Sequence, residues 1–306
     1  MDIRKLNYRF GWLVADYLNE NPCAITPELL RSVLPSDEAD AATEQVVYAA
    51  LLSGFLGLDP ETSEEDRFLE DRYLRPGLRR MDPAPWRENP YYLAIHFPLS
   101  GAAGQNGWSL AWQEYQPYEL FLRDDLILTD DLRQIPALGY FPESFRYPSV
   151  LQDGREWMSI KPSEIASSQA AVDAASGQVV TFGLGLGYFA FMAARKPEVV
   201  SVTVVERDPS VILLFREFIL PQISCKDKIR VIQADAFDYL EHQMSLCPPD
   251  FVFMDIWHDI ADGTPLYVRA RLYESRFPQT RFMYWIERSI RCALVDELAQ
   301  RAESAL

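Results

Sequence analysis

Three glycines at alternate positions, Gly183, Gly185 and Gly187, interrupt an apolar stretch of the chain. Glycine tolerates positive φ angles and lets a ligand come close to the backbone, so such a loop after a buried strand favours a nucleotide site. The spacing fits both the dinucleotide fingerprint G-x-G-x-x-G/A and the shorter pattern G-x-G-x-G. A turn that binds no ligand is the third interpretation.

Acidic residues follow this loop at three later points, each at the expected end of a strand. Glu206 ends "VTVVE", Asp235 and Ala236 follow "VIQA", and Asp255 follows "FVFM". A carboxylate can accept hydrogen bonds from ribose hydroxyls or from an amino group of a base. Asp235 could instead cap the helix that follows it, because Asp is a favoured N-cap residue.

The stretch "DIWHDIADG", residues 255–263, gathers groups that could move or hold a proton. Asp255, His258 and Asp259 are the candidate catalytic residues, because carboxylates and imidazoles are the usual general acids and bases. An exposed loop histidine without a catalytic role is an equally good interpretation of His258. We expect a loop here that ends near Gly263.

Alternating helix and strand patterns from residue 162 onward must position these groups. Unbroken apolar strands separated by helices predict a parallel sheet that is covered on both faces. Right-handed crossovers make such a sheet doubly wound, and its ligands bind beyond the carboxyl ends of the strands. The expected strands span residues 178–183, 199–206, 228–235, 250–255 and 281–287.

The chain resembles class I S-adenosylmethionine-dependent methyltransferases in four motifs that occur in the same order. These are the glycine loop, Glu206, "VIQADAFDYL" and "PDFVFMDIWHD". The resemblance covers residues 162–290, whereas the dinucleotide pattern accounts for the first two motifs alone. It implies an α/β fold with a doubly wound, mainly parallel Rossmann-like sheet and S-adenosylmethionine as the cofactor. The cofactor-binding residues that it implies are Gly183, Gly185, Gly187, Glu206, Asp235 and Ala236.

The chain departs from the family pattern at two points. Family members usually carry an acid two residues before the first glycine, where this chain has Thr181, and that change affects the methionine end of the cofactor. Too few residues follow position 287 for the last helix and strand pair of the family. Either the sheet is short, or strands expected within residues 91–129 supply the missing edge.

The resemblance implies an enzyme that transfers a methyl group to a small or unidentified acceptor. Spermidine-synthase-type aminopropyltransferases, which use decarboxylated adenosylmethionine, are an alternative because the fold and the acid after the fourth strand also resemble theirs. A non-catalytic adenosylmethionine-binding protein is a third possibility, since a fold does not settle a function.

The first half of the chain has a different pattern. Apolar spacing predicts helices over residues 3–19, 26–34, 41–56 and 63–74, and "RPGLRR" at 75–80 is expected to be a solvated helix end. Prolines between 76 and 90 then break helicity, and β patterns follow at 91–97, 108–115 and 118–129. The predicted division is an N-terminal helical region at 1–90, a β-containing connecting segment at 91–160, and a Rossmann-like cofactor-binding domain at 161–306.

The net charge, the apolar runs and the cysteines limit the kinds of ligand and partner that we expect. A formal net charge of -16 would repel a phosphate backbone, so we expect a small-molecule substrate and no nucleic acid, and such a charge would attract cationic ligands. The apolar runs fall short of the ~20 residues that a membrane span needs, so no membrane is expected. The four cysteines form no CxxC pair, which predicts reduced thiols, no metal site and a cytoplasmic protein. The sequence does not indicate an oligomeric state.

Overall fold

The fold is described from a computed structural model, which places residues 2–36, 39–97 and 107–304. The chain forms two compact units: unit 1 comprises Met1–Trp86 and Glu114–Arg146, and unit 2 comprises Arg87–Gln113 and Tyr147–Leu306. The expected connecting segment 91–160 is divided between them: residues 114–146 pack with the N-terminal helices, while residues 91–97, 107–113 and 147–160 pack with the C-terminal part. Each unit is described by itself.

Unit 1 is built from helices that pack around aromatic and aliphatic side chains. Side chains cap the N-termini of α2 and α3: the Thr26 hydroxyl accepts a hydrogen bond from the Leu29 amide, and the Asp40 carboxylate accepts one from the Thr43 amide. The expected helices are confirmed, and short strands form β1-β6-β3 and β4-β5 sheets. The elements are α1 (Ile3–Glu20), α2 (Pro27–Val33), α3 (Ala41–Phe55), α4 (Glu64–Leu69), η1 (Glu70–Leu74), α5 (Arg75–Gly77), β1 (Leu78–Arg80), α6 (Ala84–Arg87, which ends at the start of unit 2), β3 (Phe121–Leu122), β4 (Ile127–Leu128), β5 (Gln134–Ile135) and β6 (Leu138–Tyr140).

Two local expectations are wrong. The segment 75–80 is not a solvated helix end, because its second half is strand β1, which pairs in parallel with β6. The segment 91–97 is not a strand, because helix α7 (Pro90–Ala94) occupies most of it. There Pro90 stands at the first helical position and the Asn89 side chain accepts a hydrogen bond from the Tyr91 amide, so local capping outweighs the β preference of the aromatic residues.

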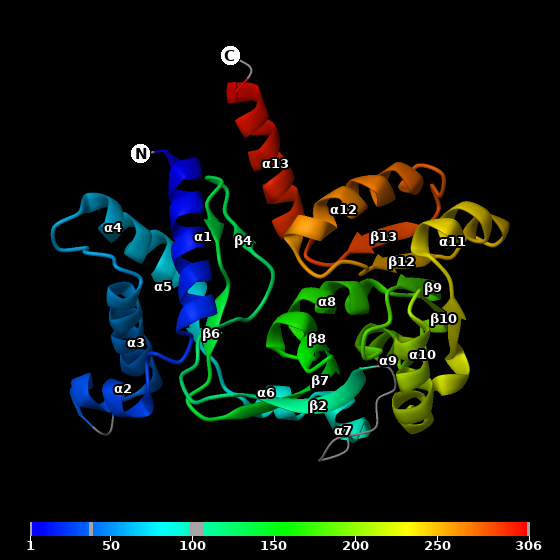
Figure 1. The fold of residues 1–306 in the computed structure, drawn as a ribbon, viewed down its shortest axis with the longest axis horizontal. Helices are drawn as coiled ribbons and strands as arrows, with labels where there is room; N and C mark the ends of the chain where they lie inside the picture. The colour runs from blue at the N-terminus through cyan, green and yellow to red at the C-terminus, as the bar shows by residue number, and fades with distance from the viewer. Residues whose placement is uncertain (1, 37–38, 98–106, 305–306) are drawn as a thin grey trace. The chain divides into compact units, whose positions relative to one another are not determined.

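The expected parallel sheet is confirmed in unit 2. Its five strands run in the order β11-β10-β9-β12-β13, and every neighbouring pair is parallel. Helices α8, α9 and α10 lie on one face and α11 and α12 on the other (Figure 1). The order corresponds to 3-2-1-4-5 along the chain and defines a doubly wound, Rossmann-like fold. The strands are β9 (Gly177–Phe182), β10 (Val199–Glu206), β11 (Ile229–Gln233), β12 (Phe251–Met254) and β13 (Arg281–Tyr284).

The sheet is short, as the first of the two alternatives predicted. Over the described residues, no strand from 91–129 joins it; residues 98–106 lie outside the description. The strand β2 (Trp108–Tyr115) belongs instead to a separate β2-β7-β8 sheet, with β7 (Phe145–Gln152) and β8 (Arg155–Ser159) antiparallel. The helices of unit 2 are α7, α8 (Pro162–Ala174), α9 (Tyr188–Ala194), α10 (Pro209–Leu214), η2 (Phe215–Ile219), η3 (Leu220–Gln222), η4 (Lys226–Lys228), α11 (Ala236–His242), η5 (Met244–Leu246), α12 (Ile260–Glu274) and α13 (Glu287–Ser304).

The middle of this sheet is held by aromatic packing. Phe253 of β12 is 1% exposed, and its ring stacks on that of Phe189 in α9 at a centroid distance of 4.4 Å. Both residues are therefore core aromatics, which join the sheet to the first crossover helix.

We predict that Phe253→Ala lowers the free energy of unfolding by about 3–5 kcal/mol, because it removes a buried ring and leaves a cavity. Urea denaturation measures the change. Val200→Ala is the matched control: Val200 is also a strand residue, in β10, but is 68% exposed, so its change should stay within about 0.5 kcal/mol. Equal effects of the two substitutions would contradict the assigned packing.

Candidate functional site

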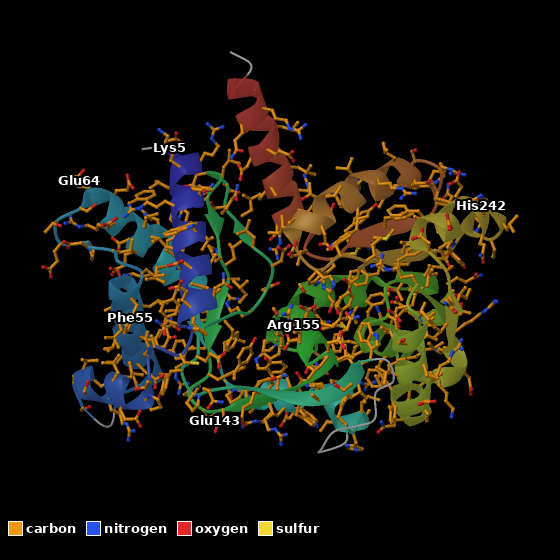
Figure 2. All side chains as sticks on the ribbon, in the orientation of Figure 1. Lys5, Phe55, Glu64, Glu143, Arg155 and His242 are labelled. Carbon is orange, nitrogen blue, oxygen red and sulfur yellow. The ribbon has the colours of Figure 1, made fainter. Side chains whose placement is uncertain are left out.

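A cavity of about 450 Å³ opens at the carboxyl ends of the parallel strands of unit 2. Its volume falls in the range of ordinary small-molecule sites. Its walls come from the ends of β9, β10, β11 and β12, from α8 and from the β8 strand, whose first residue, Arg155, is labelled in Figure 2. All of the residues that line it belong to unit 2.

The glycine loop after β9 forms part of the cavity wall. Gly183 has φ +93°, and a Cβ there would lie 1.8 Å from the carbonyl oxygen of Asp255, so a side chain has no room. Gly183 and Gly185 line the cavity, whereas Gly187 caps α9 and is not among the lining residues. Glycine at position 183 therefore lets two strand ends approach each other closely.

Met158 of β8 covers Gly185. Its sulfur accepts a hydrogen bond from the Leu186 amide at 3.1 Å, and a Cβ on Gly185 would lie 1.9 Å from the same sulfur. Gly185 thus makes room for a protein side chain. A valine at position 185 would displace Met158 first, so Gly185→Val would not by itself test whether this loop binds a ligand. Sequence reasoning missed Met158 because a lone methionine in a strand gives no signal of such a contact.

Glu206 is fixed at the end of β10 by backbone groups. Its Oε2 accepts a hydrogen bond from the Leu184 amide at 3.0 Å, and its Oε1 accepts one from the Asp208 amide at 2.8 Å. Each carboxylate oxygen can accept more than one hydrogen bond. The cavity-facing carboxylate can therefore also accept from two neighbouring hydroxyls.

Asp235 has both of the features that the sequence left as alternatives. It is the N-cap of α11, where its Oδ1 accepts hydrogen bonds from the amides of Phe237 and Asp238. It also lines the cavity, as does Ala236. The cap leaves Oδ2 available, so capping and ligand binding are compatible.

Of the three candidate catalytic residues that follow β12, two line the cavity and one does not. Asp255 and His258 line the cavity, and the His258 ring meets the Trp157 indole edge to face, with a centroid distance of 4.0 Å. Asp259 does not line the cavity, because its carboxylate caps α12 in a capping box with Asp262. Helix α12 begins at Ile260, so the expected loop does not extend to Gly263.

Asp255 lies in an unusual electrostatic environment. Burial raises the pKa of its carboxyl group well above the usual range, and the negative charges of Glu164 and Glu206 raise it further. Burial and the neighbouring negative charges therefore both favour the protonated form of this carboxyl group. A cation in the cavity would oppose this effect and favour the carboxylate.

Glu164, in the first turn of α8, is a site residue that sequence reasoning missed. Burial raises the pKa of its carboxyl group to about 7; Lys161 lowers this pKa and Glu156 raises it. Glu164 lines the main cavity and, with Asp255 and Thr181, a small adjoining void of about 20 Å³. An acid in the first turn of a helix is ordinary, so its type and position gave no signal.

Trp285 also lines the cavity, and its indole nitrogen donates a hydrogen bond to Ser167 at 2.8 Å. Glu287 is not among the lining residues and accepts a hydrogen bond from the Tyr267 hydroxyl. The end of β13 therefore contributes an indole wall to the site.

Within the described parts of the chain, no cluster of three or more His, Cys, Asp or Glu side chains has a geometry that could hold a metal ion. The four cysteines are free thiols. None of the helices described is both long enough and apolar enough to cross a membrane.

No family model and no curated protein matches this chain. The chain does match solved structures. The chain is similar to a putative O-methyltransferase from Klebsiella pneumoniae, with 19% identity over 39% of this chain and 52% of that one, at a TM-score of 0.30. It is similar to a putative methyltransferase from Porphyromonas gingivalis W83, with 20% identity over 38% and 30% of the two chains, at a TM-score of 0.32.

A third similar structure is the O-methyltransferase from Bacillus cereus in complex with SAH, with 17% identity over 39% of this chain and 53% of that one, at a TM-score of 0.29. The chain thus spans about half or less of the length of these proteins. The strand order of unit 2 itself defines the class, which is a Rossmann-like α/β domain.

We predict that Glu164→Gln stabilises the protein above pH 7. A carboxyl group whose pKa is raised on folding binds more protons in the folded state, so the stability of the parent falls as pH rises from about 4.5 to 7. The amide has no such penalty, and we expect the variant to gain about 1–3 kcal/mol at pH 8 and nothing at pH 4.5. Urea unfolding at both pH values measures this difference, and a pH-independent difference would contradict the raised pKa.

Proposed function

We propose that this chain is an S-adenosylmethionine-dependent methyltransferase that acts on a small-molecule acceptor. The observation that carries the proposal is the placement of Glu206 and Asp235 at the ends of neighbouring strands, both on one cavity beside the glycine loop. Two ribose hydroxyls can donate to Glu206, and an adenine amino group can donate to Asp235. An adenosine moiety would satisfy both carboxylates at once.

The bound cofactor would supply a methyl group activated by a sulfonium, which leaves positioning as the main task of the protein. Asp255 lines the cavity with Glu164 and Glu206, and a sulfonium beside Asp255 would favour the carboxylate form of that residue. His258 and Trp157 stand against each other on the same cavity and would border the acceptor. Asp259 has no part in this chemistry because its carboxylate caps α12.

Aminopropyl transfer from decarboxylated adenosylmethionine is a second candidate. The cavity is lined by seven carboxylic residues and by only three Lys or Arg residues, of which Lys161 pairs with Glu156 at 3.0 Å. Such an excess of acid favours a ligand without a carboxylate. A non-catalytic adenosylmethionine-binding protein would bind the same ligands without turnover.

Isothermal calorimetry with four ligands tests the proposal: S-adenosylmethionine, S-adenosylhomocysteine, decarboxylated adenosylmethionine and NAD. We expect the first two to bind and NAD not to bind. Binding of the decarboxylated form alone would favour aminopropyl transfer. Binding of NAD alone, or of none of the four, would overturn the proposal.

We predict that Asp255→Asn lowers turnover by ~10²-fold or more while cofactor affinity stays within a few-fold, because the side chain acts at the transferred group. A screen of amines, amino acids and small phenols with labelled cofactor supplies the acceptor for this assay. Asp259→Asn is the matched control, since it makes the same change in the same segment at a residue off the cavity. Asp255→Asn turnover equal to that of the parent would remove Asp255 from the mechanism.

A further inference from the structure

Thr181 stands where methyltransferases of this class usually carry an acid, two residues before the first glycine. The structure shows which group lies nearby. Thr181 is buried in β9 and borders the void of about 20 Å³ that Gly183, Asp255 and Glu164 also border. A carboxylate from another element, helix α8, therefore lies on the same small space.

The Glu164 carboxylate is held there without a protein partner. Across the described residues, it makes no hydrogen bond and no ion pair; the nearby cation, Lys161, is engaged by Glu156 at 3.0 Å. Glu164 is partly exposed, and a carboxyl group that loses much of its water without gaining a hydrogen-bond partner is costly and is uncommon in a purely structural role. Its position on the wall of a cavity indicates that its partner is a ligand.

We propose that Glu164 replaces the missing acid of the glycine motif and binds the ammonium group at the amino-acid end of the cofactor. This inference rests on the proposed function. It makes Glu164 a binding residue that comes from the helix before the first strand of the sheet. Thr181, which is shorter, then leaves the space in which the Glu164 side chain and the ammonium group meet.

Charge balance supports this assignment. The charges that act on Glu164 are those of Lys161, which lowers its pKa, and Glu156, which raises it; Glu164 in turn raises the pKa of Asp255, which follows β12. Lys161 already pairs with Glu156, so an ammonium group would add a further cation beside Glu164 and would lower its pKa from about 7. Binding of an ammonium ligand at pH 7 should therefore release protons from the protein.

The test compares three nucleoside ligands that differ only at the amino-acid end. S-adenosylhomocysteine carries an ammonium and a carboxylate, its decarboxylated form carries the ammonium alone, and 5′-methylthioadenosine carries neither. Glu164→Gln should weaken the first two by about tenfold to a hundredfold, the effect of losing one charged hydrogen bond, and should change the third less than twofold. Calorimetry at pH 7 gives the affinities.

Two control variants are compared with Glu164→Gln. Glu164→Asp keeps the charge on a shorter chain and should recover part of the lost affinity for the two ammonium ligands. Glu198→Gln removes the same charge from an exposed residue just before β10, at the far end of the sheet, and should leave all three affinities unchanged. Loss of affinity for all three ligands in Glu164→Gln would make Glu164 a structural residue and overturn the inference.

Proton release provides a readout that does not depend on affinity. Titrations in buffers of different ionisation enthalpy should show protons released on binding of S-adenosylhomocysteine to the parent, and fewer on binding to Glu164→Gln or on binding of 5′-methylthioadenosine. If 5′-methylthioadenosine and S-adenosylhomocysteine bind the parent and Glu164→Gln identically, the inference fails while the proposed function stands. If neither ligand binds the parent, both fail.

Discussion

The contact between the ends of β9 and β12 is the constraint on which the rest of unit 2 depends. The Asp255 amide donates to the Phe182 carbonyl at 2.9 Å, which continues the parallel pairing beyond both strands. The Asp255 carbonyl then lies so close to Gly183 that no Cβ fits between them. This approach places the first glycine of the loop beside the acid that follows β12, and the cavity opens next to both.

The cavity brings together acidic side chains whose desolvation is unfavourable in the free protein. Glu164 and Glu206 raise the pKa of Asp255, Glu156 raises that of Glu164, and Lys161, the cation that acts on Glu164, already pairs with Glu156. Such groups reduce the stability of the free protein at neutral pH. A cationic ligand would offset this loss of stability, so the free protein already has a site that favours a positively charged ligand.

The sheet and its order could be predicted from the sequence because buried parallel strands leave continuous apolar runs separated by helical patterns. The glycine loop and the strand-end acids Glu206, Asp235 and Asp255 could be placed for the same reason: a topology fixes where strand ends meet. The helix at Pro90–Ala94 could not be predicted, because its cap and its first-turn proline compete with the β preference of Tyr91 and Tyr92. Glu164, Trp157 and Met158 could not either, since they reach the cavity through tertiary packing that no local spacing encodes.

The position of β9 in the chain has a consequence for how the molecule forms. Its two neighbours in the sheet are β10, which follows within a short crossover, and β12, which is synthesised about seventy residues later. Long-range parallel pairing is slow, because the intervening chain must be closed into a loop before the contact is made. During synthesis, one side of the central strand therefore stays unpaired until most of the domain has emerged. The cavity is completed only after β12 and then β13 have joined the sheet, because Asp255 and Trp285 follow these strands, so ligand affinity is acquired late in synthesis.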